Sequence, residues 1–368
     1  MKQQQSRAAI IAVLLLGLLI FFVVYQAWNT VADVFLPVST TGQGKQVALK
    51  IRPGESTAEI ADELQTRGLI RNSYAFRLWA RIKGLDTHLQ AGVYNKLDSS
   101  MTVDKIVNEL LNAQPDAITV VIPEGWRLEQ MADRFAGSGL AKFKKQDFLK
   151  YTKQVTSFPD YNKYPLLKMV PANQSMEGLL FPASYDIPVD ADARAVINQM
   201  LDAMNTNIQD NNLAQQAKQH QMSIYQMLTL ASIVEREVFY PGDRGNIASV
   251  YWNRTFKPSD ETVGLLQADP TVQYARDTLK PPQSYWQPLQ TGGNDTAADS
   301  LWNTYTHKGL PPTPICSPGL ASMKAAAAPP QTGFYYFFAY KGGHGASKFA
   351  QTQQQFEQLK QQFGVNNG

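Results

Sequence analysis

The sequence contains one cysteine, Cys316, and only four histidines among 368 residues. A single thiol cannot form an internal disulfide, and it cannot supply a multi-thiol metal site. His344 stands in a glycine-rich turn, "KGGHG", with no cysteine or histidine close by in the sequence to complete a ligand set. We therefore predict neither a metal nor another cofactor.

The chain also lacks a large excess of charge of either sign. It has 34 Lys and Arg against 31 Asp and Glu, a formal net charge of +3. Without a strongly basic field, nucleic acid is not an expected partner. The hydrophobic fraction of 44% and the chain length are typical of a globular protein with two or three domains.

Charge is absent from one long N-terminal stretch. Residues 8–25, "AAIIAVLLLGLLIFFVVY", are apolar without a break, and the next charged residue is Asp33. A helix of this length, about 27 Å, crosses a hydrocarbon core. Lys2 and Arg7 precede it, so tail 1–7 should stay in the cytoplasm and the bulk of the chain be exported.

We therefore expect residues 8–28 to be a single-pass anchor in the cytoplasmic (inner) membrane. The rest of the chain would face the periplasm or cell wall. The alternative is a cleaved signal peptide, but the apolar run is long for one and no A-x-A site follows it. Residues 29–46 lack strong periodicity and read as a linker.

Two later segments repeat at an offset of 71 residues. Both 47–69, "VALKIRPGESTAEIADELQTRGL", and 118–140, "ITVVIPEGWRLEQMADRFAGSGL", run from a β-rich stretch through a Pro/Gly turn into a helix. Ser56 and Glu59 form a capping-box pattern at the first helix. Gly68 and Gly139 stand where the two helices should stop.

The first segment opens a domain, residues 47–115, that resembles the LysM type of small glycan-binding domain. A structural βα module without a ligand would show the same pattern. Residues 116–368 form the second domain, in which we expect helices at 191–218, 222–239, 243–255 and 347–362, a buried strand at 334–340, and mostly loop at 256–300. The predicted fold class is α+β: a transmembrane helix, a small LysM-like βα domain and a larger mixed α+β catalytic domain.

The stretch "LASIVERE" carries two acids, Glu235 and Glu237, on one predicted helix. At about 100° per residue, Glu235 falls within the apolar stripe of Met227, Ala231 and Val238, and Glu237 on the opposite side. A desolvated carboxyl group near a helix C-terminus has a raised pKa, as a general acid requires. A buried Glu235 bonded to the backbone or to an Arg is the equally weighted structural alternative.

Several blocks occur in an order that resembles the endolytic murein transglycosylases, or YceG-like family. They are "EGLLFPASY", "LASIVERE", "NIASVYWNR", "LLQADPTVQYA", "NTYTHKGLPPTPICSPG" and "YYFFAYKGGHGASKFAQTQQQF". The resemblance covers nearly the whole exported chain. It implies a lytic enzyme that cleaves MurNAc–GlcNAc bonds in nascent glycan strands of peptidoglycan and leaves 1,6-anhydro-MurNAc ends, beside the peptidoglycan synthases.

The resemblance implies that Glu235 is the catalytic acid, which then acts as the base. It also implies that six residues in the quoted blocks bind substrate: Glu177, Gln267, Asp269, Thr271, Asn303 and Tyr305. A structural role in a loop is the alternative for each of them. Two other functions stay open: a hydrolytic muramidase, and a membrane-tethered glycan-binding protein without activity.

Overall fold

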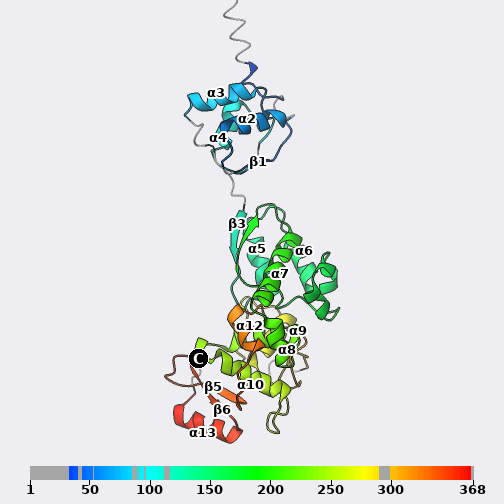
Figure 1. Ribbon diagram of the computed structural model, residues 1–368, viewed down its shortest axis with the longest axis vertical. Coiled ribbons are helices and arrows are strands. Elements are labelled where there is room, and N and C mark those ends of the chain that lie inside the picture. The colour runs from blue at the N-terminus through cyan, green and yellow to red at the C-terminus, as the bar shows by residue number, and fades with distance from the viewer. Residues whose placement is uncertain are drawn as a thin grey trace, which may run out of the picture. The chain divides into compact units, whose positions relative to one another are not determined.

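Figure 1 shows the computed structural model, which describes residues 33–39, 44–52, 54–84, 89, 91–94, 97–111, 117–289 and 299–365. The chain divides into two compact units, Met1–Asp116 and Ala117–Gly368. The predicted tail 1–7, the anchor 8–28 and residues 29–32 and 40–43 of the linker lie outside the described residues. Within the described ranges, no helix has both the length and the apolar character needed to cross a bilayer.

The described part of the N-terminal unit packs helices against a small antiparallel sheet. Strand β1 (Leu49–Ile51) pairs with β2 (Gly92–Tyr94), with Leu49 opposite Tyr94. The helices are α2 (Thr57–Thr66), α3 (Ser73–Ile82) and α4 (Val103–Glu109). Their apolar faces enclose one core, which includes Leu49, Ile51, Ile60, Leu64, Phe76, Leu97, Ile106 and Leu110.

The predicted capping box at the start of α2 is confirmed. The Ser56 backbone N–H donates to Oε2 of Glu59 at 2.7 Å, and the Glu59 N–H donates to Oγ of Ser56 at 3.3 Å. The two bonds satisfy two backbone donors that a helix start leaves without intrahelical partners.

The predicted repeat is also confirmed as a repeated strand–turn–helix. Its second copy is β3 (Ala117–Val121) followed by α5 (Leu128–Ala136). The turns contain Gly54 and Gly125 at φ +88° and +75°, and the helices are followed by Gly68 and Gly139 at +70° and +90°. These left-handed conformations suit glycine, which has no Cβ to clash with the backbone.

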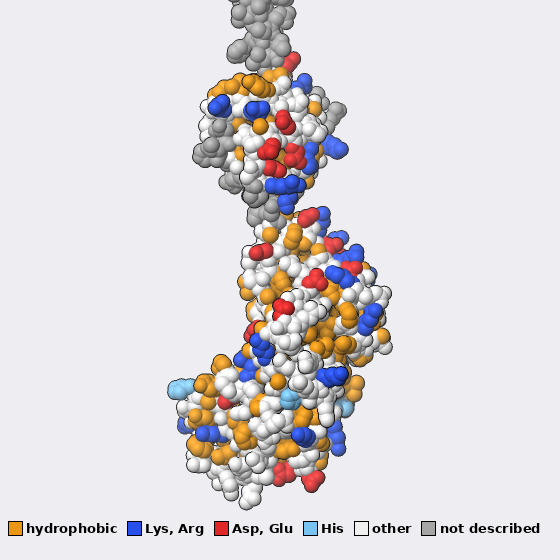
Figure 2. Space-filling model, viewed as in Figure 1, with side chains coloured by type: hydrophobic (Ala, Val, Ile, Leu, Met, Phe, Trp, Pro, Cys, Tyr) orange, Lys and Arg blue, Asp and Glu red, His pale blue; other side chains and the backbone are white. Residues whose placement is uncertain are grey.

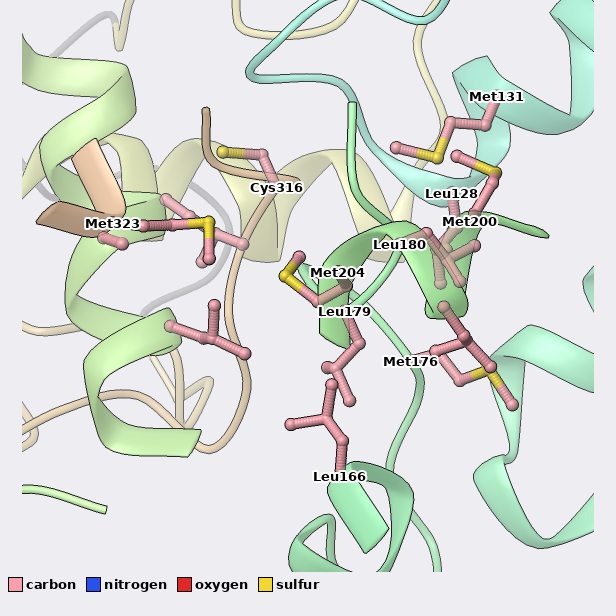
Figure 3. Packing of buried hydrophobic residues seen from close by; sticks show 14 of the residues in the cluster. Leu128, Met131, Leu166, Met176, Leu179, Leu180, Met200, Met204, Cys316 and Met323 are labelled. Carbon is pink, nitrogen blue, oxygen red and sulfur yellow. The ribbon is translucent and has the colours of Figure 1, made fainter. Parts of the chain in front are cut away.

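In the C-terminal unit, β3 pairs antiparallel with β4 (Ser184–Pro188). Helix α6 (Lys145–Lys153) packs against both α5 and α7 (Ala193–Asp210). Figure 3 shows part of the large core of this unit, where flexible methionine side chains fill space between leucines. The residues labelled there are Leu128, Met131, Leu166, Met176, Leu179, Leu180, Met200, Met204, Cys316 and Met323.

The second half of this unit is built around α9 (Ile224–Glu237), which contacts α8, α10, α11 and α12. Strands β5 and β6 form an antiparallel pair that α13 contacts. The remaining bounds are α8 (Leu213–Gln219), α10 (Arg244–Phe256), α11 (Asp269–Leu279), α12 (Leu320–Ala327), β5 (Tyr336–Ala339), β6 (Ser347–Ala350) and α13 (Gln353–Phe363). Short 3-10 turns occur at Val155–Ser157, Tyr161–Lys163, Pro165–Met169 and Pro241–Asp243.

Three expected elements differ from the structure. The helix predicted at 191–218 is interrupted at Asn212, whose φ of +53° is incompatible with a continuous helix. The region 256–300, expected to be mostly loop, contains α11, which begins with Asp269 and Pro270 in its first turn. The final segment begins with β6 before it becomes helical.

Candidate active site

A cavity of about 630 Å³ opens in the C-terminal unit. The end of α9, α10, the start of α11, β5 and α13 contribute its walls. This volume lies within the range of small-molecule and cofactor sites. The polar groups that line it are Glu237, Tyr251, Arg254, Gln267, Asp269 and Tyr305, and the aromatic ones include Phe239, Tyr336, Phe337, Phe338 and Phe356.

Glu237 is the last residue of α9, so its carboxyl group stands at the end of the helix that reaches the cavity. Its Oε1 accepts a 2.9 Å hydrogen bond from the Tyr251 hydroxyl. Loss of hydration raises the pKa of Glu237 to about 7; the Tyr251 bond lowers it, nearby Asp269 raises it, and Arg254 and Arg236 lower it. A carboxyl group with this pKa can both give and take a proton near neutral pH.

The two acids at the end of α9 are both half-buried, and Glu237, expected on the exposed side, lines the cavity. Glu235 is not part of the cavity lining. Its Oε2 accepts a 3.0 Å hydrogen bond from the backbone N–H of Gly319, the N-cap residue of α12. Every residue of α9 from Met227 to Val234 is buried, so this helix has no polar face from which its exposed side could be predicted.

Three of the six predicted binding residues line the cavity: Gln267, Asp269 and Tyr305. The Tyr305 hydroxyl donates a 2.6 Å hydrogen bond to Oδ1 of Asp269. The Arg254 guanidinium donates to Oε1 of Gln267 at 3.1 Å and to the backbone carbonyl of Leu266 at 2.7 Å. These bonds fix a carboxylate, an amide and a phenol at the cavity surface.

Thr271 and Asn303 are not part of the lining. Thr271 is fully buried, and its hydroxyl donates to the Ala268 carbonyl at 2.7 Å. Oδ1 of the buried Asn303 accepts the backbone N–H of Tyr305 at 3.0 Å. Both side chains hold the segments that carry Asp269 and Tyr305, and the structure places neither in the cavity lining.

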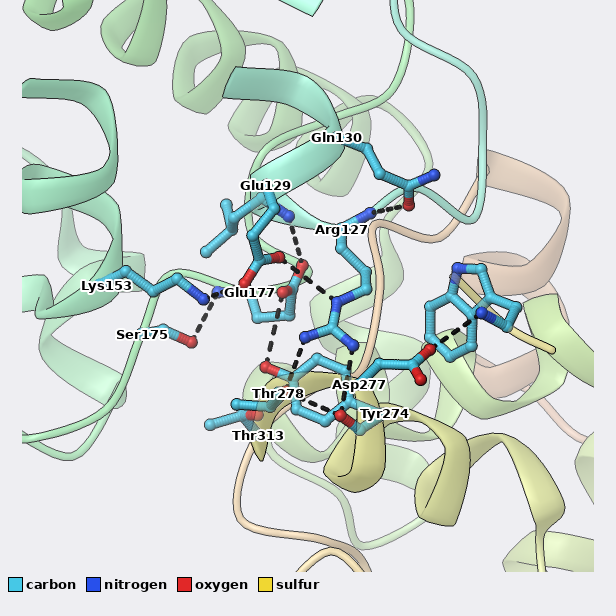
Figure 4. Close-up of polar contacts among 12 residues, drawn as sticks. Arg127, Glu129, Gln130, Lys153, Ser175, Glu177, Tyr274, Asp277, Thr278 and Thr313 are labelled. Carbon is cyan, nitrogen blue, oxygen red and sulfur yellow. Dashed lines mark hydrogen bonds and ion pairs between the residues drawn. The ribbon is translucent and has the colours of Figure 1, made fainter. Parts of the chain in front are cut away.

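Glu177 is also not a lining residue, because it is fully buried elsewhere in the C-terminal unit. Figure 4 shows it in a polar network with Arg127, Glu129 and Tyr274. Its Oε1 accepts the N–H of Leu128 at 3.2 Å, and its Oε2 accepts the Tyr274 hydroxyl at 3.5 Å. Burial and, to a smaller degree, Glu129 raise the pKa of Glu177 to about 8. The structure therefore places Glu177 in a buried polar network and not in the lining of the cavity.

Three residues of the cavity were not among the predicted site residues: Glu237, Tyr251 and Arg254. Tyr251 and Arg254 lie three residues apart in the block "NIASVYWNR", so they share one side of α10. This spacing could have indicated a site, because a tyrosine and an arginine on one side of a helix can both reach the same carboxylate.

The cavity thus presents a carboxyl group that titrates near neutral pH beside an amide, a second carboxylate and several aromatic rings. These groups can together carry out general acid–base catalysis on a sugar-like substrate. Residues 49–362 match the profile of the YceG-like family, and the chain belongs to this family.

Curated relatives carry a common name. A protein of Bacillus subtilis (strain 168) named endolytic murein transglycosylase is 30% identical over 332 residues, covering 86% of this chain and 84% of the relative. A protein of the same name from Streptococcus pneumoniae serotype 2 is 30% identical over 331 residues, covering 86% of this chain but 58% of the relative.

A solved structure is also similar. The crystal structure of a YceG-like protein from Listeria monocytogenes matches with a TM-score of 0.53 and 31% sequence identity. The match covers 86% of this chain and 100% of that chain.

Proposed function

We propose that this protein is an endolytic lytic transglycosylase of peptidoglycan, a lyase that cleaves the bond between MurNAc and GlcNAc in nascent glycan strands. The names of its relatives and the general acid–base cavity both support this function. The observation that carries the proposal is Glu237, a carboxyl group with a pKa of about 7 inside a cavity with aromatic walls.

Glu237, rather than Glu235, takes the role of acid and base in this proposal. Protonated Glu237 gives its proton to the glycosidic oxygen as the bond from C1 of MurNAc to that oxygen breaks. The resulting carboxylate then removes the proton of the MurNAc 6-hydroxyl as O6 bonds to C1. The product is a 1,6-anhydro ring, no water is consumed, and Glu237 ends the cycle protonated.

The other cavity groups would hold the sugar in the reactive position. The Gln267 amide and the Asp269 carboxylate are exposed to the cavity and suit sugar hydroxyls. The 80% exposed ring of Phe239 offers a flat face for a pyranose ring. Positioning of the 6-hydroxyl against C1 is the step that favours ring closure over attack by water.

One observation favours hydrolysis as a second candidate function. Asp269 shares the cavity with Glu237, and hydrolytic glycosidases use two carboxyl groups, one on each side of the bond. Asp269 is engaged by the Tyr305 hydroxyl at 2.6 Å. The two reactions differ in their product, because hydrolysis leaves a reducing MurNAc end that is heavier by one water molecule.

The proposal includes a single-pass anchor at residues 8–28 in the cytoplasmic membrane, supported by the apolar run and by Lys2 and Arg7 before it. The exported part would carry a LysM-like domain in the N-terminal unit and act beside the peptidoglycan synthases.

The test is digestion of uncrosslinked glycan strands by the detergent-solubilised full chain, with mass analysis of the new ends. We expect anhydro ends from wild type and a loss of about 10²–10⁴-fold in rate for Glu237→Gln. Glu235→Gln is the matched control two residues away and should keep most activity. Reducing ends would show that the protein is a hydrolytic muramidase. An unchanged rate in Glu237→Gln would show that Glu237 is not the catalytic acid. A wild-type chain that cuts no strand would be a glycan-binding protein.

A further inference from the structure

Helix α3 presents an apolar stripe to solvent. Tyr74, Leu78 and Ile82 are 71%, 49% and 66% exposed. They are spaced four residues apart, so they follow one side of the helix. The other side packs Ala75, Phe76 and Ala80 into the core of the N-terminal unit. Figure 2 shows hydrophobic side chains gathered over α3. The stripe therefore has no partner within the described part of its own unit.

Arginine side chains border this stripe. Arg77 and Arg81 are both exposed, and the Arg77 guanidinium lies 5.6 Å from the Tyr74 ring centre. Together with Tyr74, Leu78 and the start of α2, they line a concave surface of about 330 Å³. Among the described residues, no acidic side chain forms an ion pair with Arg77 or Arg81. Exposed apolar groups beside unneutralised cations are typical of helices that bind a lipid interface.

Residues 33–38, which follow the apolar run in the sequence, contact α3 and the residues just before it. The Phe35 ring lies 5.4 Å from the Trp79 ring, and Arg71, just before α3, donates from Nε and Nη2 to the Pro37 carbonyl at 2.9 and 2.8 Å. Leu36 and Val38 of this segment are themselves 48% and 38% exposed.

Sequence distance sets how far this face can be from a membrane anchor. Asp33, the first described residue, comes five positions after Trp28, the last residue of the proposed anchor. Five residues span at most about 18 Å. If residues 8–28 cross the bilayer, the α3 face is held within a short reach of its outer surface.

We propose that the α3 face is a membrane-docking surface for anionic phospholipid. Tyr74, Leu78 and Ile82 enter the boundary between headgroups and acyl chains, while Arg77 and Arg81 bind phosphate groups. The proposal rests on the membrane anchor of the proposed function. A bilayer accounts for the cations, the apolar stripe and the nearby attachment of residues 33–38 together.

The test uses the full chain in vesicles of phosphatidylcholine with or without phosphatidylglycerol. The buried thiol of Cys316 is replaced by Ser, and an environment-sensitive fluorophore is attached at Leu78→Cys. In anionic vesicles we expect a blue-shifted emission that lipid-borne spin labels quench. The control is the same probe at Lys218→Cys, an exposed position of α8 in the other unit, which should stay water-like.

A charge variant tests the arginines. Arg77→Glu with Arg81→Glu should lower the ratio of docked to undocked probe by roughly tenfold or more. Lys218→Glu with Lys280→Glu makes the same change in net charge at exposed positions of the other unit and should leave the ratio unchanged.

Two outcomes distinguish failure of the docking surface from failure of the membrane anchor. If the chain floats with the vesicles but the probe at position 78 stays water-like, the docking surface is overturned and the anchor stands. If the chain does not float, the anchor and the docking surface fail together, with the glycan-cleaving function unaffected. An equal blue shift in neutral vesicles would overturn the recognition of anionic headgroups.

Discussion

The Tyr251 hydroxyl donates a 2.9 Å hydrogen bond to Oε1 of Glu237 across the interface of α10 and α9. Burial stabilises the neutral acid and the bond stabilises the charged carboxylate; together with Asp269 and two nearby arginines, these effects bring the pKa of Glu237 to about 7. The contact between Tyr251 and Glu237 therefore helps to set the pH range in which Glu237 can act as an acid.

Activity should fall above neutral pH. If protonated Glu237 starts the reaction, kcat/KM decreases about tenfold per pH unit once the pH exceeds the pKa of about 7. The measurement is a pH–rate profile on uncrosslinked glycan strands. A profile that stays flat up to pH 9 would show that another group gives the proton.

Tyr251→Phe should move that alkaline limb to higher pH. The substitution removes a hydrogen bond that lowers the pKa of Glu237. Hydrogen bonds to charged groups are worth about 1.5–3 kcal/mol, and each pH unit corresponds to about 1.4 kcal/mol, so a shift of about one to two units is expected. Tyr240→Phe, at an exposed tyrosine outside the cavity lining, is the control and should leave the profile in place.

Glu235 should matter for stability more than for chemistry. Its carboxylate accepts the Gly319 N–H at the start of α12. Glu235→Ala removes this acceptor and should lower the free energy of unfolding by about 1–2 kcal/mol, while Glu235→Gln keeps an acceptor and should cost less. Urea unfolding of both variants measures the difference. Equal losses would mean that the charge, not the hydrogen bond, is what α12 requires.

Glu177 should make the folded state less stable as pH rises. Its pKa of about 8 in the folded protein is above its ordinary value of 4.5, so folding favours the protonated form. The stabilisation is complete below about pH 4.5 and is lost progressively as pH rises to 8. The change is on the order of 4 kcal/mol.

Glu177→Gln tests this directly, because glutamine stays neutral at every pH. We expect its free energy of unfolding, measured in urea at pH 5 and pH 8, to change less between the two pH values than that of wild type. The prediction fails if the two proteins lose the same stability over this interval.

Local turn chemistry made part of the fold predictable. The capping pair Ser56–Glu59 and the glycines at 68 and 139 mark helix boundaries through contacts only a few residues long. The interruption at Asn212 was not predictable in this way, because a left-handed asparagine leaves the helical pattern on both sides unchanged. Helix α11 was missed because Asp269–Pro270 is as typical of a turn as of a helix start.

The sequence blocks that contribute to the candidate site could be predicted, but the individual side chains that line the cavity could not. Gln267, Asp269 and Tyr305 reach the cavity surface, whereas Thr271 and Asn303, in the same blocks, lie beneath it. Family resemblance groups residues that contact a ligand with residues that hold them, and only the fold separates the two. The choice between Glu235 and Glu237 required tertiary structure, because a helix buried on all sides carries no amphipathic signal.

The far wall of the cavity comes from Gln353 and Phe356 on α13, the last helix of the described chain. These residues are synthesised more than a hundred positions after Glu237. Until α13 has been synthesised, the emerging polypeptide therefore carries Glu237 without the wall that completes the cavity. The order of the elements along the chain therefore delays completion of the cavity until α13 has emerged.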